Sequence, residues 1–597
     1  MLEPQPMPPP DPLDQALIPG RRRPGEMDGP LPSASVQDNP GAVPAPMLSA
    51  FPGDDFPLPD RWRLATAFCP QKVYRAIQAI CRSPLDPYRQ TTIKGDRPLD
   101  RAKLPWLPIR GDDWFFVLTG VSDTMLEYRS FPTPTGGQTT AQPGSLDSFA
   151  RSTSQFAAQT FLIGASLYKG QTTFKPPEIE YKLTLAFNAN YARVNEKRVL
   201  FVSPSAPTYR KDVFVGVQEA FVDYHLRNVS TRYDFDSIRI GIQPFQTDFR
   251  GFLFNDDNLG IRLFGNRDNN RFQYNLAAFW RLEKDTNSGL NDLGQKPRRD
   301  WVVVANLYRQ DLPVPGFTSQ IAAVYNRNRE GDEFYYDKNG FPVRPALLGD
   351  HRGRDYDIAY FGYNGDGHFG RLNLTVSAYG AVGRDRNSIF TSRAAKVRAF
   401  FFAAEPSYDI DWVRVRLSFL YASGDKNPYD DTETGYDAIL ENPIFAGADT
   451  SYWIRQSIPF VGGGRQIGIN GRNGVLADLR SSKDEGQSNF NNPGIMLIGA
   501  GADFDLTPTL RVSANVNRLA FADTTVLQVL RNEGSIPRSI GMDYSASAIW
   551  RPRMTQNIVM RLSASMLEAG RGFRDLFTQP SGSRRYVSML ANVTLTY

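Results

Sequence analysis

The chain has 597 residues, of which 41% are hydrophobic and 12% aromatic, and its formal net charge is +5. This small net charge gives no general support for nucleic-acid binding. A mean hydropathy of −0.40, with no run of about 18 apolar residues, argues against a protein that crosses a membrane by helices. It does not exclude a membrane β-barrel, whose strands need only about 9 to 11 residues with every second one apolar.

Residues 1–60 are rich in proline and show no hydrophobic periodicity. We expect this tract to be disordered, because it has too little apolar surface to bury. It contains the run Arg21-Arg22-Arg23, but no basic segment followed by an apolar one, which an export signal requires. For an exported protein this predicts either a misassigned start or a signal that has already been removed.

Residues 61–112 form a second unit, in which apolar residues between 73 and 80 fit one face of a short helix. The only two cysteines, Cys69 and Cys81, would lie roughly 18 Å apart on a straight helix, so a disulfide would need a bend and stays open. We expect a periplasmic lead-in on the rim of the next domain, or a plug or docking segment for a periplasmic protein partner. The block resembles one found in bacterial outer-membrane barrels.

From residue 113 to residue 597, apolar and polar residues alternate in one segment after another. In 181–188 and 413–419 the odd-numbered residues are apolar and most even-numbered ones are polar, which places the two kinds on opposite faces of a strand. About 18 such segments follow one another, and single-chain bacterial barrels have an even number of strands. The pattern predicts an all-β fold, a closed antiparallel transmembrane β-barrel over residues 113–597.

The lengths of the connections give a second, independent test. Short links alternate with longer ones, as bacterial barrels alternate periplasmic turns with extracellular loops. The short links include 266–269, 312–316, 365–367 and 506–509, and the longer ones include 285–299, 330–354, 426–492 and 570–584. This alternation predicts that the barrel begins and ends on the periplasmic side.

The last predicted strand, 586–597, has an apolar face that includes Val593, Leu595 and Tyr597. A final aromatic residue on such a strand resembles the C-terminal signal that the bacterial barrel assembly machinery recognises. The resemblance implies a place in the bacterial outer membrane, with outer-membrane lipid and the assembly machinery as partners.

Residues 238–258 run from a strand into an aromatic loop that carries Asp248, Arg250, Asp256 and Asp257. This segment resembles the strand-to-loop passage of porin-type barrels. Either it folds toward the lumen as a constriction, or it is a capped extracellular loop.

Signals for catalysis, metals and cofactors are poor. No G-x-S-x-G, H-E-x-x-H or C-x-x-C-H motif occurs, so we expect neither an enzyme nor a cofactor. The acidic residues over 430–437 lack the spacing of an EF-hand, which favours a solvated loop over a metal site. Asp223 and His225 share one strand face and are the pair that an outer-membrane hydrolase would use.

Arginines are the more informative charges on the faces predicted to point inward. An arginine is always charged and presents planar donors that match carboxylate or phosphate. The predicted pore-lining set is Arg239, Arg262, Arg271, Arg281, Arg371, Arg414, Arg416, Arg511 and Arg561. Acids that balance these arginines are the alternative, and Glu219, Asp223, Glu283 and Asp543 are predicted to point inward. A barrel of about 18 strands with such a lumen resembles the alginate-export family of outer-membrane channels.

These observations predict an outer-membrane channel for polar or anionic solutes, with an anionic polysaccharide among them. Two other functions stay open. One is a structural scaffold or sheath that holds a periplasmic or cytochrome partner, and the other is the hydrolase based on His225 and Asp223.

Overall fold

A computed structural model describes most of the chain from residue 113 onward and little before it. The described residues are 92–95, 98–100, 113–130, 133–134, 149–150, 153–170, 176–195, 200–230, 234–341, 343–344, 352–447, 458–459, 466–467, 485–552, 557–576 and 584–597. The proline-rich tract, both cysteines and the helix predicted between 73 and 80 lie outside these ranges.

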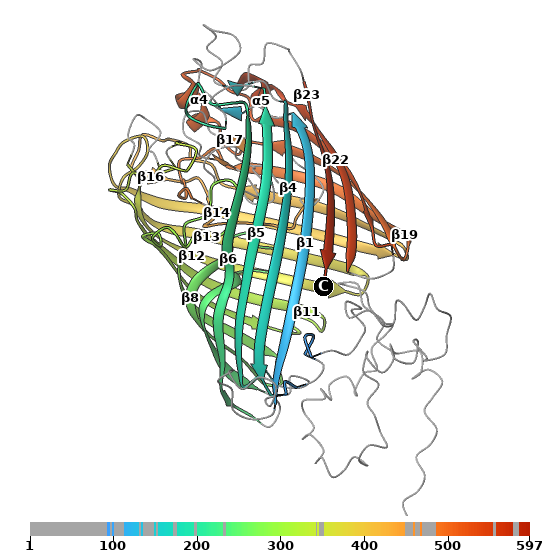
Figure 1. Ribbon diagram of the computed structural model, residues 1–597. Coiled ribbons are helices and arrows are strands. Elements are labelled where there is room, and N and C mark those ends of the chain that lie inside the picture. Colours follow the sequence, from blue (N-terminus) through green and yellow to red (C-terminus); the bar gives the residue numbers. More distant parts are fainter. Residues whose placement is uncertain are drawn as a thin grey trace, which may run out of the picture.

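Eighteen long strands form one closed antiparallel barrel (Figure 1). Each strand pairs with the next long strand along the chain, and β1 pairs with both β4 and β23, which closes the sheet. The predicted fold class and number of strands are therefore confirmed. The strands are β1 (Trp114–Ser130), β4 (Thr153–Lys169), β5 (Ile179–Val194), β6 (Tyr209–Asn228), β7 (Phe235–Gln246), β8 (Asn255–Arg267), β9 (Phe272–Trp280), β10 (Asp300–Arg309), β11 (Phe317–Arg329), β12 (Asp355–Phe369), β13 (Leu372–Asp385), β14 (Ala395–Ile410), β15 (Val413–Ala422), β19 (Ile495–Thr507), β20 (Leu510–Ala520), β21 (Ser539–Trp550), β22 (Ile558–Ala569) and β23 (Arg585–Thr596).

Short elements occupy the longer connections. They are β2 (Thr133–Pro134), β3 (Phe149–Ala150), β16 (Thr432–Glu433), β17 (Ile458–Pro459), β18 (Gln466–Ile467), α4 (Thr525–Arg531) and α5 (Arg571–Leu576). No helix in the described ranges is long and apolar enough to cross a membrane.

The two ends of the barrel differ, as the alternating link lengths predict. Figure 1 shows β1 starting and β23 finishing toward one end, while α4 and α5 lie at the other. Turns such as 268–271, 370–371 and 411–412 join strands at the first end. We call the end with the short turns periplasmic and the end with the long loops extracellular.

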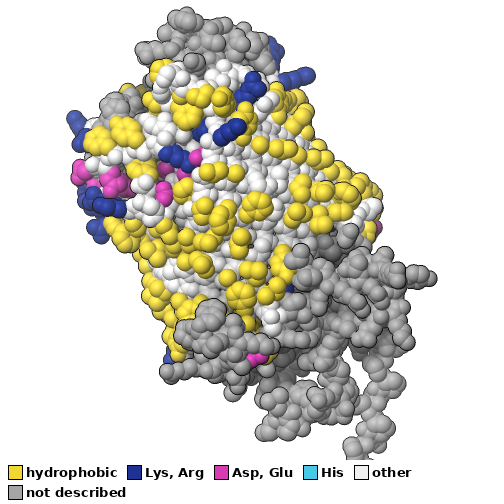
Figure 2. Space-filling view, viewed as in Figure 1, with side chains coloured by type: hydrophobic (Ala, Val, Ile, Leu, Met, Phe, Trp, Pro, Cys, Tyr) yellow, Lys and Arg dark blue, Asp and Glu magenta, His cyan; other side chains and the backbone are white. Residues whose placement is uncertain are grey.

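The outer face of the barrel is apolar and exposed. Ile240, Phe361 and Leu417 are 52%, 59% and 61% exposed, and hydrophobic side chains cover much of the barrel wall in Figure 2. Their neighbours along each strand point inward and include many buried polar residues. Apolar residues outward and polar residues inward on a closed barrel define a membrane-spanning wall, because closure leaves no unpaired strand edge in the lipid.

The barrel closes at a seam between its first and last long strands. β1 and β23 are in register from Val121 opposite Thr596 onward, and Tyr597 exchanges two backbone hydrogen bonds with Gly120. Below that point the edge of β1 pairs with residues 93 and 94, since the Leu118 N–H donates to the Ile93 carbonyl at 2.7 Å and Lys94 bridges to Val117. The Lys94 ammonium lies 3.7 Å from the centre of the Tyr597 ring.

Candidate pore and constriction

The loop after β7 folds into the lumen and is organised by Asp248. The Asp248 carboxylate is buried and accepts hydrogen bonds from the backbone N–H groups of residues 250–253. The Tyr379 hydroxyl, on β13, also donates to it at 3.0 Å. A single acid therefore closes the turn and attaches it to another part of the barrel wall.

Arg250 reaches the same part of the wall. Its Nη2 donates to the Thr375 hydroxyl at 2.6 Å and lies 3.8 Å from Asp366 and 4.0 Å from Glu405. These partners belong to β12, β13 and β14, so the loop crosses the lumen from β7 and β8. The Arg250 side chain keeps 28% of its surface exposed, which leaves it in contact with water inside the barrel.

A second segment, 436–447 from the long loop after β15, lies against the first. The Ile439 N–H donates to the Leu253 carbonyl at 3.1 Å, and the Asn255 N–H donates to the Leu440 carbonyl at 2.9 Å. Farther along, the Ala446 N–H donates to Glu405 at 2.9 Å. We call the two segments 247–254 and 436–447 the constriction, because together they extend across the inside of the barrel.

Asp256 and Asp257, also predicted for the constriction, lie at the start of β8. Asp256 is buried and forms an ion pair with Lys284 at 2.7 Å. The Asp257 carbonyl accepts from the Asn291 amide at 3.1 Å. Both residues thus attach β8 to the loop that follows β9.

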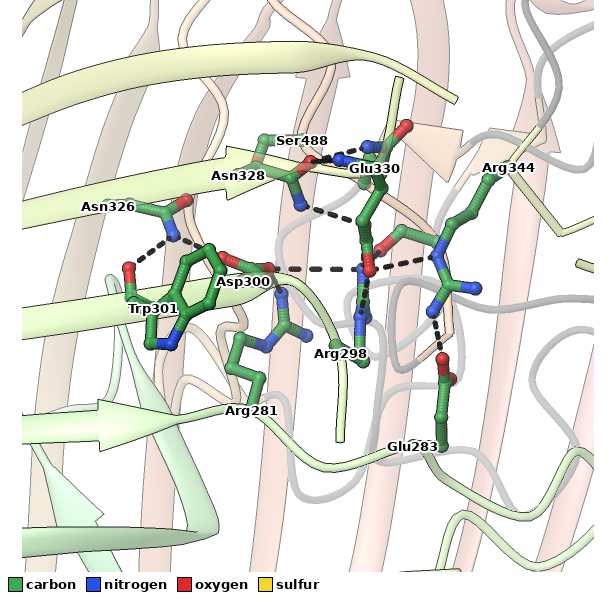
Figure 3. Close-up of polar contacts among 12 residues, drawn as sticks. Arg281, Glu283, Arg298, Asp300, Trp301, Asn326, Asn328, Glu330, Arg344 and Ser488 are labelled. Atoms are coloured by element: carbon green, nitrogen blue, oxygen red, sulfur yellow. Dashed lines mark hydrogen bonds and ion pairs between the residues drawn. The ribbon is translucent and has the colours of Figure 1, made fainter. Parts of the chain in front are cut away.

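The extracellular part of the lumen holds a buried network of ion pairs (Figure 3). Arg298 lies 2.9 Å from Glu330, and Arg344 lies 3.2 Å from Glu330 while it also pairs with Glu283. The side chains of these four residues are at most 5% exposed. Burial alone would raise the pKa of Glu330, but the two arginines outweigh burial and lower it to about 2.

Two further buried pairs extend this network along the wall. Arg281, one of the predicted pore arginines, lies 2.8 Å from Asp300 and is almost fully buried. Arg354 pairs with Asp385 and lies 3.2 Å from Glu433, again with no solvent contact at the arginine. Arg281 is therefore packed between the wall and the loops, where it does not contact open water.

Four other predicted pore arginines point inward and pair with acids. Their pairs keep partial contact with water, with side-chain exposures between 9% and 34%. The pairs are Arg239 with Asp223 at 2.7 Å, Arg414 with Asp409 at 2.5 Å, Arg416 with Asp503 at 2.6 Å and Arg511 with Asp505 at 2.7 Å. The last three lie in the periplasmic half, near the ends of β14, β15, β19 and β20.

The other predicted arginines occupy different places. Arg262 points inward and donates to the neutral Asn275 amide oxygen at 2.7 Å. Arg561 is on the inward face, opposite Asn592. Arg271 and Arg371 lie in exposed turns at the periplasmic end. The prediction that Arg271 and Arg371 line the pore is therefore wrong, because both residues lie in turns beyond the ends of the strands.

Several charged residues of the lumen were not predicted from the sequence. Most acids that pair with the lumen arginines are among them, because the sequence predicts only four acids on the inward faces. The residues missed are Asp300, Asp409, Asp503 and Asp505 of the wall and Arg298, Glu330, Arg344 and Arg354 of the loops. The strand register would have revealed the wall acids, since Asp503 lies diagonally across from Arg416 on the neighbouring strand.

The proposed hydrolase pair is not joined in the structure. Asp223 pairs with Arg239, whereas His225 lies 2.8 Å from the side-chain oxygen of Asn228. The acidic residues over 430–437 are also separated, because Glu433 pairs with Arg354 and Asp431 lies 3.8 Å from Lys396. Within the described ranges, no group of three or more acidic, histidine or cysteine side chains could hold a metal ion.

The fold and the lumen define a membrane-spanning β-barrel of the porin type. No family model and no curated protein matches the chain. Solved barrels are similar in architecture. Pseudomonas aeruginosa OccK9 (OpdG) and OccK7 (OpdD) are each 11% identical, with a TM-score of 0.43 over 81% of this chain and 98% of theirs. A BenF-like porin from Pseudomonas fluorescens Pf-5 is 9% identical, with a TM-score of 0.42 over 81% of this chain and 98% of its own. Likenesses at this level establish no shared function, and the fold rests on the strand pairing.

Proposed function

We propose that the protein is a channel of the bacterial outer membrane that passes polar or anionic solutes through the constriction. One observation carries this proposal. The constriction presents a partly exposed arginine, Arg250, to a lumen whose inward strand faces are polar. A permeating anion would meet the Arg250 guanidinium where the two loop segments cross the lumen.

The preference for anions is supported by Arg262, whose hydrogen-bond partner Asn275 is neutral. Arg250 adds a partly exposed guanidinium, which also has ion-pair contacts with Asp366 at 3.8 Å and Glu405 at 4.0 Å. The paired arginines add little net field, because each stands beside an acid. Within this proposal we favour small anions over an anionic polysaccharide, since two loop segments cross the lumen at the level of Arg250.

Single-channel recording in planar bilayers tests the function. The variant Arg250→Ser should raise the conductance and lower the anion-to-cation permeability ratio, because it removes both bulk and charge from the constriction. Arg371→Ser, in an exposed turn, is the matched control and should change neither. A wild-type protein that inserts but does not conduct would overturn the proposal.

The scaffold alternative makes a different prediction. A sheath would hold its partner in the lumen, and here the chain's own segments 247–254 and 436–447 extend across that space. Purification in mild detergent should therefore yield a conducting barrel without a stoichiometric protein partner. A partner that stays bound and blocks the conductance would favour the scaffold.

We also propose that Val593, Leu595 and Tyr597 form the assembly signal. Val593 and Leu595 lie on the outward face of β23, and Tyr597 continues that face at the periplasmic end. Tyr597→Glu should lower the yield of assembled barrel, as read from heat-modifiable mobility on gels, because the seam would place a charge at the lipid interface. Tyr597→Phe keeps the aromatic ring and is the control.

A further inference from the structure

The outer face of the barrel carries a groove across β7 to β11. Its volume is about 960 Å³, and its lining includes Ile240, Ile261, Val303 and Tyr325. The floor is Ala278, which lies in register with Ile261 on β8 and with Val303 on β10. The groove exists because a methyl group stands in a row of larger outward side chains.

Two tryptophans form the extracellular edge of the groove. Trp280 and Trp301 face each other across β9 and β10 and stack, with ring centroids 6.3 Å apart. The Trp280 indole N–H donates to the Arg298 carbonyl, which fixes the ring. Aromatic side chains of this kind mark the membrane–water interface, so the groove below them faces the hydrocarbon of the outer leaflet.

Arginines gather directly above this edge. Arg299, Arg327 and Arg329 line the extracellular end of the groove, and Arg384 and Arg386 continue the cluster on β13 and just after it. Asp357, at their centre, pairs with Arg329 at 2.5 Å and with Arg386 at 3.1 Å. The acids beside the cluster are Asp355, Asp357 and Glu333, which interacts electrostatically with Arg299. Three acids do not neutralise five arginines, so the cluster is positive.

Three of these arginines are available to a ligand. Arg299, Arg327 and Arg384 are exposed, and no carboxylate of the described residues lies within 4 Å of them. An arginine near the membrane interface costs little by itself, but several without acidic partners repel one another. A bound anion would relieve that repulsion, and arginine binds phosphate through two parallel hydrogen bonds.

We propose that the groove and its arginines bind a phosphate-bearing lipid of the outer leaflet. The acyl chains would lie along Ile240, Ile261 and Val303, and the phosphates would meet Arg299, Arg327 and Arg384 above the tryptophans. The apolar groove would thus contact the acyl tails of the lipid, and the arginines above it would contact the charged head group. The proposal rests on the proposed outer-membrane location but does not depend on transport.

Native mass spectrometry of the full chain in detergent, with bisphosphorylated lipid A as the probe, tests the site. The triple variant Arg299→Gln, Arg327→Gln and Arg384→Gln should weaken binding about a hundredfold, at roughly the contribution of one membrane-surface arginine each. The control is the double variant Arg193→Gln and Arg518→Gln, which changes exposed arginines near the extracellular ends of β5 and β20 and should bind like the wild type. Heat-modifiable mobility on gels verifies that each variant is folded.

A second variant tests the apolar part of the site without changing any charge. Ala278→Phe fills the floor of the groove from the lipid side and should also weaken binding.

Retention of the probe by both groove variants would overturn the proposal, as would equal binding of dephosphorylated lipid A. Efficient disulfide cross-linking between two copies through Val303→Cys would instead assign the face to a second copy of the chain. Conductance recorded in parallel separates failure of this site from failure of the channel.

Discussion

Ion pairs line both ends of the lumen. Those of the network around Glu330 at the extracellular end are shielded from water (dry), and those at the periplasmic end are partly exposed to water (wet). Arg298 and Glu330 have no exposed side-chain surface, whereas Arg511 and Asp505 are 34% and 16% exposed. A desolvated pair strongly resists loss of one partner, because the remaining charge stays buried. An exposed pair contributes little to stability. The same chemistry therefore holds the loops in place at one end and places balanced, water-exposed charges along the pore at the other.

The largest effect should follow from breaking the dry network. Arg298→Met leaves the buried Glu330 with Arg344 alone, and it should destabilise the folded loops by about 3–5 kcal/mol. Limited proteolysis of the extracellular loops should become faster, and the open-state conductance should rise as the loops move. Arg511→Ser, in the wet region, is the matched control and should leave proteolysis unchanged. Equal sensitivity of the two variants would contradict the comparison.

The dry network should also respond to acid in two phases. The pKa of Glu330, lowered to about 2 from an ordinary 4.5, gives stability that is present above pH 4.5 and is lost as the pH falls toward 2. Burial raises the pKa of Asp337, in the same loop, to about 6 from an ordinary 3.8. Its contribution is present below pH 3.8 and is lost as the pH rises through 6.

Resistance of the loops to an acid-tolerant protease should therefore rise from pH 7 to about pH 5 and fall below pH 4. Asp337→Asn keeps the side-chain shape and should reduce the rise without affecting the fall, because burial also raises the pKa values of Glu283 and Glu485 in the same network. A fall that begins already at pH 6 in the wild type would contradict the assignment to Glu330.

The wet pairs should control selectivity with little effect on stability. The double variant Arg414→Ser and Arg416→Ser removes two positive charges from the periplasmic half and leaves Asp409 and Asp503. The anion-to-cation permeability ratio should fall several-fold at low salt and less at high salt, because exposed charges are screened over about 8 Å at physiological ionic strength. The reversal potential measures this, and an unmoved value in a conducting barrel would show that these residues do not line the path.

The smallest effect should come from the opposite change. Asp503→Asn leaves Arg416 with its amide partner Asn515 but without its acid, so the lumen gains one net positive charge. The anion preference should rise slightly, and the thermal unfolding midpoint should move by no more than a few degrees. A fall in anion preference would show that the pair acts in some other way.

Much of the wall could be predicted from the sequence, because the period of two fixes which face each side chain occupies. That period placed Arg239 and Asp223 on the inward faces. Their contact also depends on the register of β6 and β7, which shifts between His225 and Arg227. No local sequence pattern indicates such a shift in strand register.

The constriction could be predicted only as one of two alternatives. Asp248 and Arg250 stood out in a loop, but their partners Tyr379 and Thr375 lie more than 120 positions farther along the chain. Such contacts depend on where a loop folds after the barrel has closed. The arginines above the outer groove were missed for a related reason, since Arg299 and Arg327 come together only through the pairing of β10 and β11.

The seam has a consequence for the order in which the barrel forms. Gly120 pairs with Tyr597, almost the full length of the barrel domain away, whereas every other pair of neighbouring long strands is adjacent in the chain. The entropy of closing a loop grows with its length, so hairpins can form early and the contact between β1 and β23 comes last. Ile93 and Lys94 then cover the edge of β1 that β23 does not reach. Residues 93 and 94 thus protect this edge, and a chain without them would insert with the lower edge of β1 open to pairing with another molecule.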